Sequence, residues 1–342
     1  MSRIKRPKEL EGADHLQYTE EDRRFGTPQV VAEYRAGRLA CKIIADLGCG
    51  VGFQTIAFAK TCKHVYAVEK DLRKLEYAQT NAFALGLTNI TFIHGDALDP
   101  SIVSQLKECQ TIFCDTERPP QEAERTLASL APNPLLLIET YSSITPNLCI
   151  EVPPHLSDIP FDCEREYLSL NGRLNRLTLY LGGLKKTEKS VTLLPENHSL
   201  YYTGKKMAAA SCLPPQFKYL YEVNPAVVIA ELIGELGDYD FFTYLNKLYA
   251  ASMQAKPSFF LRGYRVLART SLTLTDIKEA LHKNGAGKVT LRQKIDPQDY
   301  WKERKKYEEG LTGTKKVHLF IFEEALLCEE IYDKLAPKSR AV

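Results

Sequence analysis

The sequence predicts an α/β fold followed by a smaller α+β domain, and three observations support this prediction. From residue 43 onward, short apolar segments alternate with helical segments, a rhythm typical of a parallel sheet covered by helices on both faces. Asn171-Gly172 then separates two further strand-like segments, and this pair is a preferred turn of antiparallel hairpins. The chain has 342 residues, enough for two domains of roughly 150 residues each.

The domain boundaries follow from changes in composition along the chain. We assign residues 1–40 to an N-terminal arm and helix, residues 41–185 to the α/β domain, and residues 186–342 to the α+β domain. The boundary near 185 lies in a basic, turn-rich stretch, residues 183–206. Residues 1–24 are polar and densely charged, which predicts a loose arm or short helices.

The elements of the α/β domain follow in chain order. Thr27 is expected to cap a helix that begins at Pro28 and continues to Ala40, because proline suits the first helical position. The predicted strands cover residues 43–45, 64–68, 89–93, 111–114 and 134–139, and two helices cover residues 53–60 and 71–86. A hairpin of residues 166–170 and 173–181 completes the sheet. In the α+β domain we expect strands at 191–194, 218–221, 288–291 and 317–322, and helices at 225–236, 274–284 and 297–308.

Composition excludes several classes of protein. Hydrophobic residues make up 44% and charged residues 26%, so the chain is neither fibrous nor wholly disordered. The net charge of +2 excludes a basic field over the whole protein, though not a local basic surface. The nine cysteines form no C-x-x-C pair, so we expect a reducing compartment and no metal cluster. No signal peptide or apolar run long enough for a membrane helix is found, and a cytoplasmic location without membrane contact is expected.

Three acidic residues follow the first three predicted strands. They are Asp46, Glu69 and Asp96, and a G-x-G-x-G turn at residues 48–52 comes directly after the first. Ligands of open α/β sheets bind outside the carboxyl ends of the strands, and glycines allow a ligand to approach the backbone closely. These acids are therefore expected to face one ligand.

The spacing of the glycines distinguishes between two cofactors. A dinucleotide requires G-x-G-x-x-G, but Phe53 occupies the position of its third glycine, and Asp46 would repel the phosphates. S-adenosylmethionine carries no phosphate but has a sulfonium, an ammonium and a ribose diol, all of which suit carboxylates. The pattern therefore favours S-adenosylmethionine, and a dehydrogenase is the weaker alternative.

These motifs resemble those of class I S-adenosylmethionine-dependent methyltransferases, which have a Rossmann-like sheet ending in an antiparallel hairpin. Residues 46–54, Asp-Leu-Gly-Cys-Gly-Val-Gly-Phe-Gln, resemble their first motif, while residues 68–71 and 95–97 resemble the ends of their second and third strands. The resemblance implies that the glycine turn holds the amino-acid end of the cofactor with help from Asp46. Glu69 would then accept the ribose hydroxyls, and Asp96 would bind the adenine amine. The full set of expected cofactor residues is Asp46, Gly48, Cys49, Gly50, Gly52, Phe53, Glu69, Lys70, Asp96 and Ala97.

The segment after the fourth predicted strand is the candidate catalytic motif. Residues 115–120 read Asp-Thr-Glu-Arg-Pro-Pro. The segment resembles in part the motif that methyltransferases of nucleic-acid amines have at this place, which is Asp-Pro-Pro-aromatic or Asn-Pro-Pro-aromatic. We expect Asp115 to orient the amine and accept its developing charge, Glu117 to be an alternative proton acceptor, and Arg118 to contact a phosphate. A purely structural turn is one alternative reading. A second alternative is a Cys114 nucleophile, which would need an electropositive setting.

The rest of the chain resembles one group within that class. Residues 24–35 and 162–178 are similar to methyltransferases related to trimethylguanosine synthase, and residues 218–225 and 257–267 resemble the THUMP-like C-terminal domain of that group. The resemblance implies methylation of a base nitrogen in RNA, either tRNA or rRNA, by in-line transfer. The missing prolines leave two alternatives: a methyltransferase of a small molecule or protein, and a cofactor-binding module without catalytic activity.

Local charge is consistent with an anionic substrate. Residues 283–318 contain ten Lys or Arg and five Asp or Glu, together with Tyr300, Trp301 and Tyr307. Basic residues interleaved with aromatic residues suit phosphate contacts and base stacking. The alternative is a solvated helix face whose aromatic side chains turn to the core.

Overall fold

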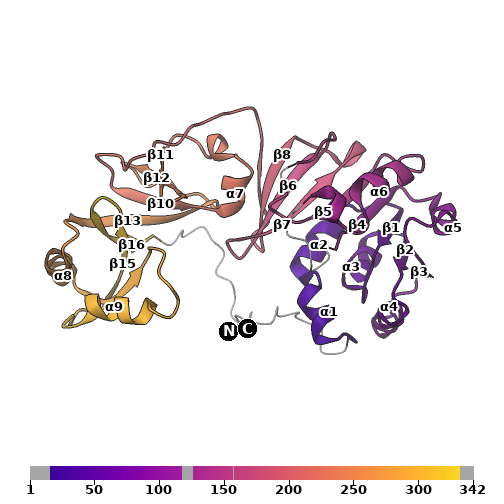
Figure 1. Ribbon diagram of the computed structural model, residues 1–342, viewed down its shortest axis with the longest axis horizontal. Helices are drawn as coiled ribbons and strands as arrows, with labels where there is room; N and C mark the ends of the chain where they lie inside the picture. Colours follow the sequence, from indigo (N-terminus) through magenta and orange to yellow (C-terminus); the bar gives the residue numbers. More distant parts are fainter. Residues whose placement is uncertain (1–15, 118–125, 157, 332–342) are drawn as a thin grey trace. The chain divides into compact units, whose positions relative to one another are not determined.

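The computed structural model describes residues 16–117, 126–156 and 158–331, which form two compact units (Figure 1). The first unit ends at Tyr202 and the second begins at Thr203. Each unit contains one sheet of its own.

Nine strands form the sheet of the first unit. They are β1 Ile43–Leu47, β2 His64–Glu69, β3 Ile90–His94, β4 Thr111–Asp115, β5 Leu148–Val152, β6 Glu164–Leu170, β7 Arg173–Tyr180, β8 Lys189–Leu194 and β9 His198–Tyr201. Their order is β3-β2-β1-β4-β5-β7-β6-β8-β9. Strands β1 to β5 are parallel, and the β6–β7 hairpin joins β5 in the antiparallel sense. This arrangement confirms the predicted parallel sheet with a terminal hairpin, and Asn171 and Gly172 have the positive φ values of 51° and 71° that its turn requires.

Helices cover this sheet on both faces. They are α1 Glu20–Phe25, α2 Gln29–Arg38, α3 Phe53–Thr61, α4 Leu72–Ala84, α5 Pro100–Val103 and α6 Pro134–Tyr141. Val65 and Ala67 lie two residues apart on β2 and so share one face, where Val65 packs with α2 and α3 and Ala67 packs with α4. Helix α6 lies on the other side of the sheet (Figure 1).

The fifth predicted strand, residues 134–139, is wrong, because these residues form α6. Asn133 caps the helix by accepting a hydrogen bond from the Leu135 N–H at 2.9 Å, and Pro134 occupies the first turn. A short apolar run fits a strand or a buried helix equally well, and the cap decides between them here. The fifth strand is β5.

The start of α2 also differs from the prediction. The helix begins at Gln29, Pro28 occupies the capping position, and no side chain caps the helix. Instead, the Thr27 hydroxyl lies 3.5 Å from Arg176 Nη1. Thr27 therefore contacts the sheet rather than the helix end.

The boundary predicted near residue 185 precedes two strands that belong to the first unit. Strand β8 pairs with β6 in the parallel sense, and β9 pairs with β8. Residues 191–194 are therefore part of the first sheet, not of the second domain as predicted.

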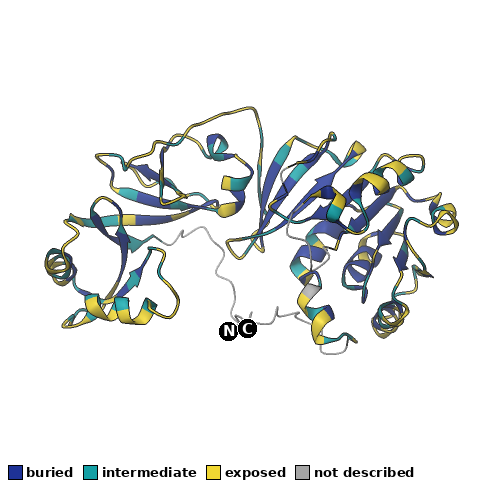
Figure 2. Cartoon of the chain, in the orientation of Figure 1, coloured by how far each residue is buried: buried dark blue, intermediate teal, exposed yellow. Residues whose placement is uncertain are grey.

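The second unit has a seven-stranded sheet and three helices among its described residues. The strands are β10 Tyr219–Val223, β11 Asp240–Tyr244, β12 Lys247–Ser252, β13 Leu261–Thr270, β14 Ala286–Leu291, β15 Lys315–Ile321 and β16 Ala325–Glu330, and the helices are α7 Pro225–Ile229, α8 Leu274–Lys283 and α9 Tyr300–Glu308. The order is β11-β12-β10-β13-β16-β15-β14. Only β14 and β15 run parallel. Helices α8 and α9 pack on one apolar cluster with β14, β15 and β16. Figure 2 shows both sheets largely buried, with the exposed residues on helices and loops.

Candidate functional site

The turn after β1 is tight on one side and open on the other. Gly48, Gly50 and Gly52 all have positive φ, at 74°, 56° and 91°. A Cβ at Gly52 would lie 3.1 Å from Cβ of Ala78 on α4, whereas a Cβ at Gly50 would meet no heavy atom within 4 Å. The backbone at Gly50 therefore borders open space that a ligand can enter.

Backbone hydrogen bonds attach this turn to the end of β2. The N–H groups of Gly48 and Cys49 donate to the Val68 carbonyl at 2.8 and 3.0 Å. The Gly50 N–H donates to Glu69 Oε2 at 2.9 Å, and the Asp71 N–H donates to Glu69 Oε1 at the same distance. Each carboxylate oxygen can accept a second hydrogen bond, so the buried Glu69 is held in place and still has capacity for a ribose diol.

Asp46 lies beneath the turn. Its side chain is 1% exposed, and Oδ2 accepts a hydrogen bond from the Thr55 hydroxyl at 2.5 Å. Burial raises the pKa of Asp46 to about 7. Asp46 thus supports the turn from inside the sheet.

The expected residues at the ends of β2 and β3 lie at the surface or just below it. Asp96 is exposed, and its Oδ1 accepts a hydrogen bond from the Leu98 N–H at 2.8 Å. Ala97 is buried, and its carbonyl accepts a hydrogen bond from the Tyr141 hydroxyl at 2.5 Å. Lys70 has an exposed side chain. These positions place one free carboxylate oxygen, Asp96 Oδ2, near the end of β3.

Residues 17–26 pack against the cofactor turn. Phe53 stacks edge-to-face on Tyr18 with 5.8 Å between ring centroids, and a Cβ at Gly26 would come within 2.7 Å of the Phe53 ring. The Asn81 side chain accepts a hydrogen bond from the Gln17 N–H at 2.6 Å and donates to the Val51 carbonyl at 2.9 Å. This part of the predicted loose arm is therefore an ordered wall of the site.

A cavity of about 220 Å³ lies at the carboxyl ends of β4 and β5. It is lined by Asp115, Thr116, Glu151, Val152, Pro153, Pro154, Asn175 and Arg176. Three strands, β4, β5 and β7, contribute to it.

An ion-pair network forms one wall of this cavity. The buried Glu151 makes ion pairs with Arg35 of α2 and with Arg176 of β7. Arg176 Nη1 also lies 3.5 Å from Asp115 Oδ2. Partial burial, together with the negative charge of Glu151, raises the pKa of Asp115 to about 7, and the two arginines oppose this rise. Asp115 is therefore poised to exchange a proton near neutral pH.

The other members of the candidate catalytic motif do not join this network. The Glu117 side chain is 74% exposed and lies 3.6 Å from Lys74 Nζ, outside the set of residues that line the cavity. Arg118 lies outside the described residues. Cys114 is buried, and burial raises the pKa of its thiol far above the ordinary value, so a thiolate nucleophile is not available there.

Sequence reasoning missed Arg35, Glu151, Asn175 and Arg176. The available signal was the presence of charged residues inside otherwise apolar helix and strand segments. Nothing local showed that these charges meet, because residues 35, 151 and 176 are far apart in the chain.

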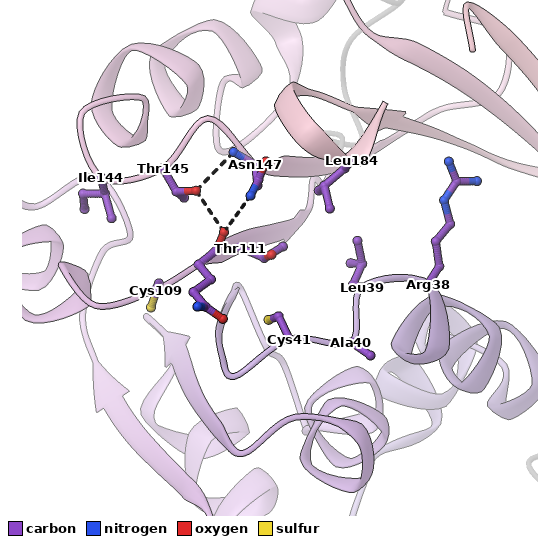
Figure 3. A pocket seen from close by; sticks show the side chains of 11 residues that line it. Arg38, Leu39, Ala40, Cys41, Cys109, Thr111, Ile144, Thr145, Asn147 and Leu184 are labelled. Carbon is purple, nitrogen blue, oxygen red and sulfur yellow. Dashed lines mark hydrogen bonds between the residues drawn. The ribbon is translucent and has the colours of Figure 1, made fainter. Parts of the chain in front are cut away.

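A larger cavity, of about 520 Å³, lies at the opposite edge of the sheet (Figure 3). It is bordered by Cys41 before β1 and by Gln110 before β4. The Gln110 carbonyl accepts hydrogen bonds from Thr145 Oγ1 at 2.9 Å and from Asn147 Nδ2 at 3.2 Å. Ligands of this architecture bind at the carboxyl edge, and Gln110, Thr145 and Asn147 already pair with one another, so we assign no ligand to this cavity.

Within residues 16–117, 126–156 and 158–331, no cluster of three or more His, Cys, Asp or Glu side chains could hold a metal ion. None of the helices in the same ranges is long and apolar enough to cross a bilayer.

The fold and the cofactor turn define the class of this chain as a Rossmann-like methyltransferase fold with a site for S-adenosylmethionine. The model of a family described as RNA cap guanine-N2 methyltransferase matches residues 41–121. A structure from Porphyromonas gingivalis W83, described as a methyltransferase, superposes with a TM-score of 0.73 at 13% identity and covers 90% of this chain and 82% of that chain. The shared fold therefore extends into both units.

Two curated proteins of Methanocaldococcus jannaschii share shorter segments. One, named "Probable cobalt-precorrin-6B C(15)-methyltransferase (decarboxylating)", is 35% identical over 83 residues, which are 22% of this chain and 45% of that protein. The other, an uncharacterized protein, is 42% identical over 55 residues, which are 16% of this chain and 21% of that protein. The chain spans less than half the length of these relatives.

Proposed function

We propose that this protein methylates an exocyclic amine of a base in RNA, with guanine N2 as the first candidate atom. The family model that matches residues 41–121 describes methyltransferases of this kind. The match reaches across the cofactor turn and through Asp115, the two places where the chemistry is expected. The single observation that carries the proposal is Asp115, a carboxylate of raised pKa at the edge of a polar cavity.

The cofactor turn fits S-adenosylmethionine. Glu69 offers two acceptor positions for ribose hydroxyls, the space beside Gly50 is open, and the carboxylates of Asp46 and Asp96 favour a cationic ligand without phosphates. The bound cofactor supplies an electrophilic methyl group on a sulfonium.

Asp115 would act on the acceptor amine. The lone pair of an exocyclic amine is delocalised into its ring, so the free amine is a poor nucleophile. A carboxylate that accepts an amine N–H holds the nitrogen in line and increases its electron density. The cofactor would supply the methyl group that this nitrogen takes up, S-adenosylhomocysteine would be the leaving group, and Asp115 would take the proton that the nitrogen loses.

Arg176 and Glu151 would position Asp115 rather than touch the reacting atoms. Arg176 Nη1 lies between the two carboxylates, so its positive charge stabilises the ionised form of Asp115. Arg35 supplies a second positive charge to Glu151. The network thus restrains the catalytic carboxylate without neutralising it.

The test is transfer of labelled methyl from S-adenosylmethionine to total small RNA from cells that lack this protein. We expect RNase-sensitive label with the wild type and with Glu117→Gln, and almost none with Asp115→Asn. Activity lost in Glu117→Gln but kept in Asp115→Asn would exchange the two roles. Label in protein or in small molecules, and none in RNA, would overturn the RNA substrate and favour a small-molecule acceptor, of the kind that the name of one curated relative indicates.

A further inference from the structure

Helix α9 of the second unit presents an unusual outer face. Trp301, the only tryptophan of the chain, is 69% exposed. Lys302 and Lys305, one residue and four residues after it, are exposed as well. Neither lysine has a carboxylate partner among the described residues. Lys305 lies one turn after Trp301, and Lys302 lies one turn before Lys305, so the exposed indole has two lysines near it that are unpaired among the described residues.

The opposite face of α9 is firmly attached to its sheet. Tyr300 and Tyr307 pack against the apolar cluster of α8 and strands β14 to β16. Glu308 Oε1 accepts a hydrogen bond from the Val289 N–H of β14 at 2.7 Å. The helix is therefore held in one orientation, and Figure 2 shows its outer side as exposed.

The indole itself is oriented by a neighbour. The guanidinium carbon of Arg304 lies 5.1 Å from the centroid of the Trp301 ring, and Arg304 is in turn paired with Glu308 at 2.7 Å. One face of the ring is thus occupied by a fixed cation. Exposure of a large aromatic side chain gives the isolated protein no stability, and an exposed aromatic ring beside lysines suits base stacking together with phosphate contacts.

We infer that this face of α9, Trp301 with Lys302 and Lys305, binds single-stranded RNA by stacking a base on the indole and pairing the lysines with phosphates. The combination fits RNA better than an acidic protein surface, because a planar base covers an exposed ring while its own backbone supplies the anions. This inference rests on the proposed function and adds a binding surface on the second unit.

The experiment uses the full-length protein and a short single-stranded RNA of mixed sequence. Because Trp301 is the only tryptophan, its selectively excited fluorescence reports on this surface alone. We expect quenching that saturates with RNA concentration. In a separate binding assay with labelled RNA, Trp301→Ala is expected to weaken affinity about 5- to 100-fold, and Trp301→Phe is expected to restore part of it.

A pair of charge variants tests the phosphate contacts. Lys302→Gln/Lys305→Gln is expected to lower the slope of log Kd against log salt by about 0.7 for each lysine that contacts a phosphate. Lys63→Gln/Lys107→Gln removes the same charge from exposed positions in the first unit and is expected to leave the slope unchanged. Phe83→Ala, at an 87% exposed aromatic of α4, is the matched control for Trp301→Ala.

Three results would overturn the inference: unchanged Trp301 fluorescence at saturating RNA, equal slopes in the two double-lysine variants, or equal quenching by polyglutamate. The proposed function is tested separately by Asp115→Asn, which should bind RNA at α9 as the wild type does. Quenching without methyl transfer would reject the function and keep the surface. Methyl transfer without quenching would do the reverse.

Discussion

Asp115 and Glu151 are direct partners in the parallel register of β4 and β5. Two carboxylates therefore lie side by side at the sheet edge, but their surroundings differ. Glu151 is paired with two guanidinium groups, whereas Asp115 forms an ion pair, among the described residues, with Arg176 alone, at 3.5 Å. The pKa of Asp115 is raised to about 7 in this setting, which separates the roles of the two acids and makes the following predictions possible.

Replacement of Asp115 by Asn should abolish catalysis selectively. An amide accepts a hydrogen bond but cannot take the proton, so we expect single-turnover methyl transfer to fall by roughly 100- to 10,000-fold. Binding of S-adenosylmethionine, measured by calorimetry, should change little. A large loss of cofactor affinity would instead place Asp115 in the cofactor site.

The rate of methyl transfer should rise with pH through about pH 7, where Asp115 ionises. Arg176→Met removes the nearest positive charge, which favours the ionised form, so the rise should move to higher pH by about one unit. Arg176→Lys keeps the charge, so it should move the profile only part of the way toward the higher pH. If the role of Arg176 were purely structural, the rate would be lower at every pH, and the pH at which it rises would not change.

Glu151→Gln should shift the same profile in the opposite direction. Loss of the neighbouring negative charge lowers the pKa of Asp115, so the rise should move to lower pH. The variant also leaves Arg35 buried without its counter-ion and leaves Arg176 with Asp115 alone, which should cost about 3–5 kcal/mol in the free energy of unfolding. Urea titration gives the second quantity, and shifts of equal sign in Glu151→Gln and Arg176→Met would contradict this account.

Glu69→Ala should weaken S-adenosylmethionine and S-adenosylhomocysteine together. Each hydrogen bond to a charged acceptor is worth roughly 1.5–3 kcal/mol, so loss of two ribose contacts predicts an effect of about 100- to 10,000-fold on either Kd. Glu76→Ala, at an exposed position of α4, is the control. Unchanged affinity for both ligands would show that the ribose binds elsewhere.

Asp46→Asn should flatten the pH dependence of stability. Burial raises the pKa of Asp46 from its ordinary value of 3.8 to about 7 in the folded protein, so the native state binds the extra proton between these pH values. Stability from this group is therefore lost as pH rises from about 4 to about 7, by at most about 4 kcal/mol at 1.4 kcal/mol per pKa unit. Urea midpoints of the wild type and the variant should converge near pH 4 and diverge toward pH 8. Parallel curves would contradict the burial effect.

Local patterns predict the strands beside the expected cofactor residues well, because each of these acids follows or ends its own strand. The signals that place Asp46, Glu69 and Asp96 lie within a few residues of strand ends, and the structure has those strands within one or two residues. The α6 segment shows that a short apolar run does not by itself distinguish a strand from a helix. Asn133 and Pro134 are residues typical of a helix start, and they could have indicated the helix.

The acceptor half depends on pairing between distant strands, which no local pattern encodes. Glu151 meets Asp115 only through the β4–β5 register, and Arg176 joins them only because β7 pairs with β5. The same reason explains why the predicted boundary near 185 lies too early in the chain, because local sequence does not show that β8 pairs with β6.

The residues expected to bind the cofactor and those expected to bind the acceptor also come from two successive stretches of the chain. The expected cofactor residues lie within residues 46–97, and the cavity proposed for the acceptor is lined by residues 115–176. Such a division lets evolution treat the two halves as separate modules. The earlier stretch can keep its cofactor-binding residues while substitutions in the later stretch change which acceptor is bound. Sequence divergence among relatives is therefore expected to concentrate after β4.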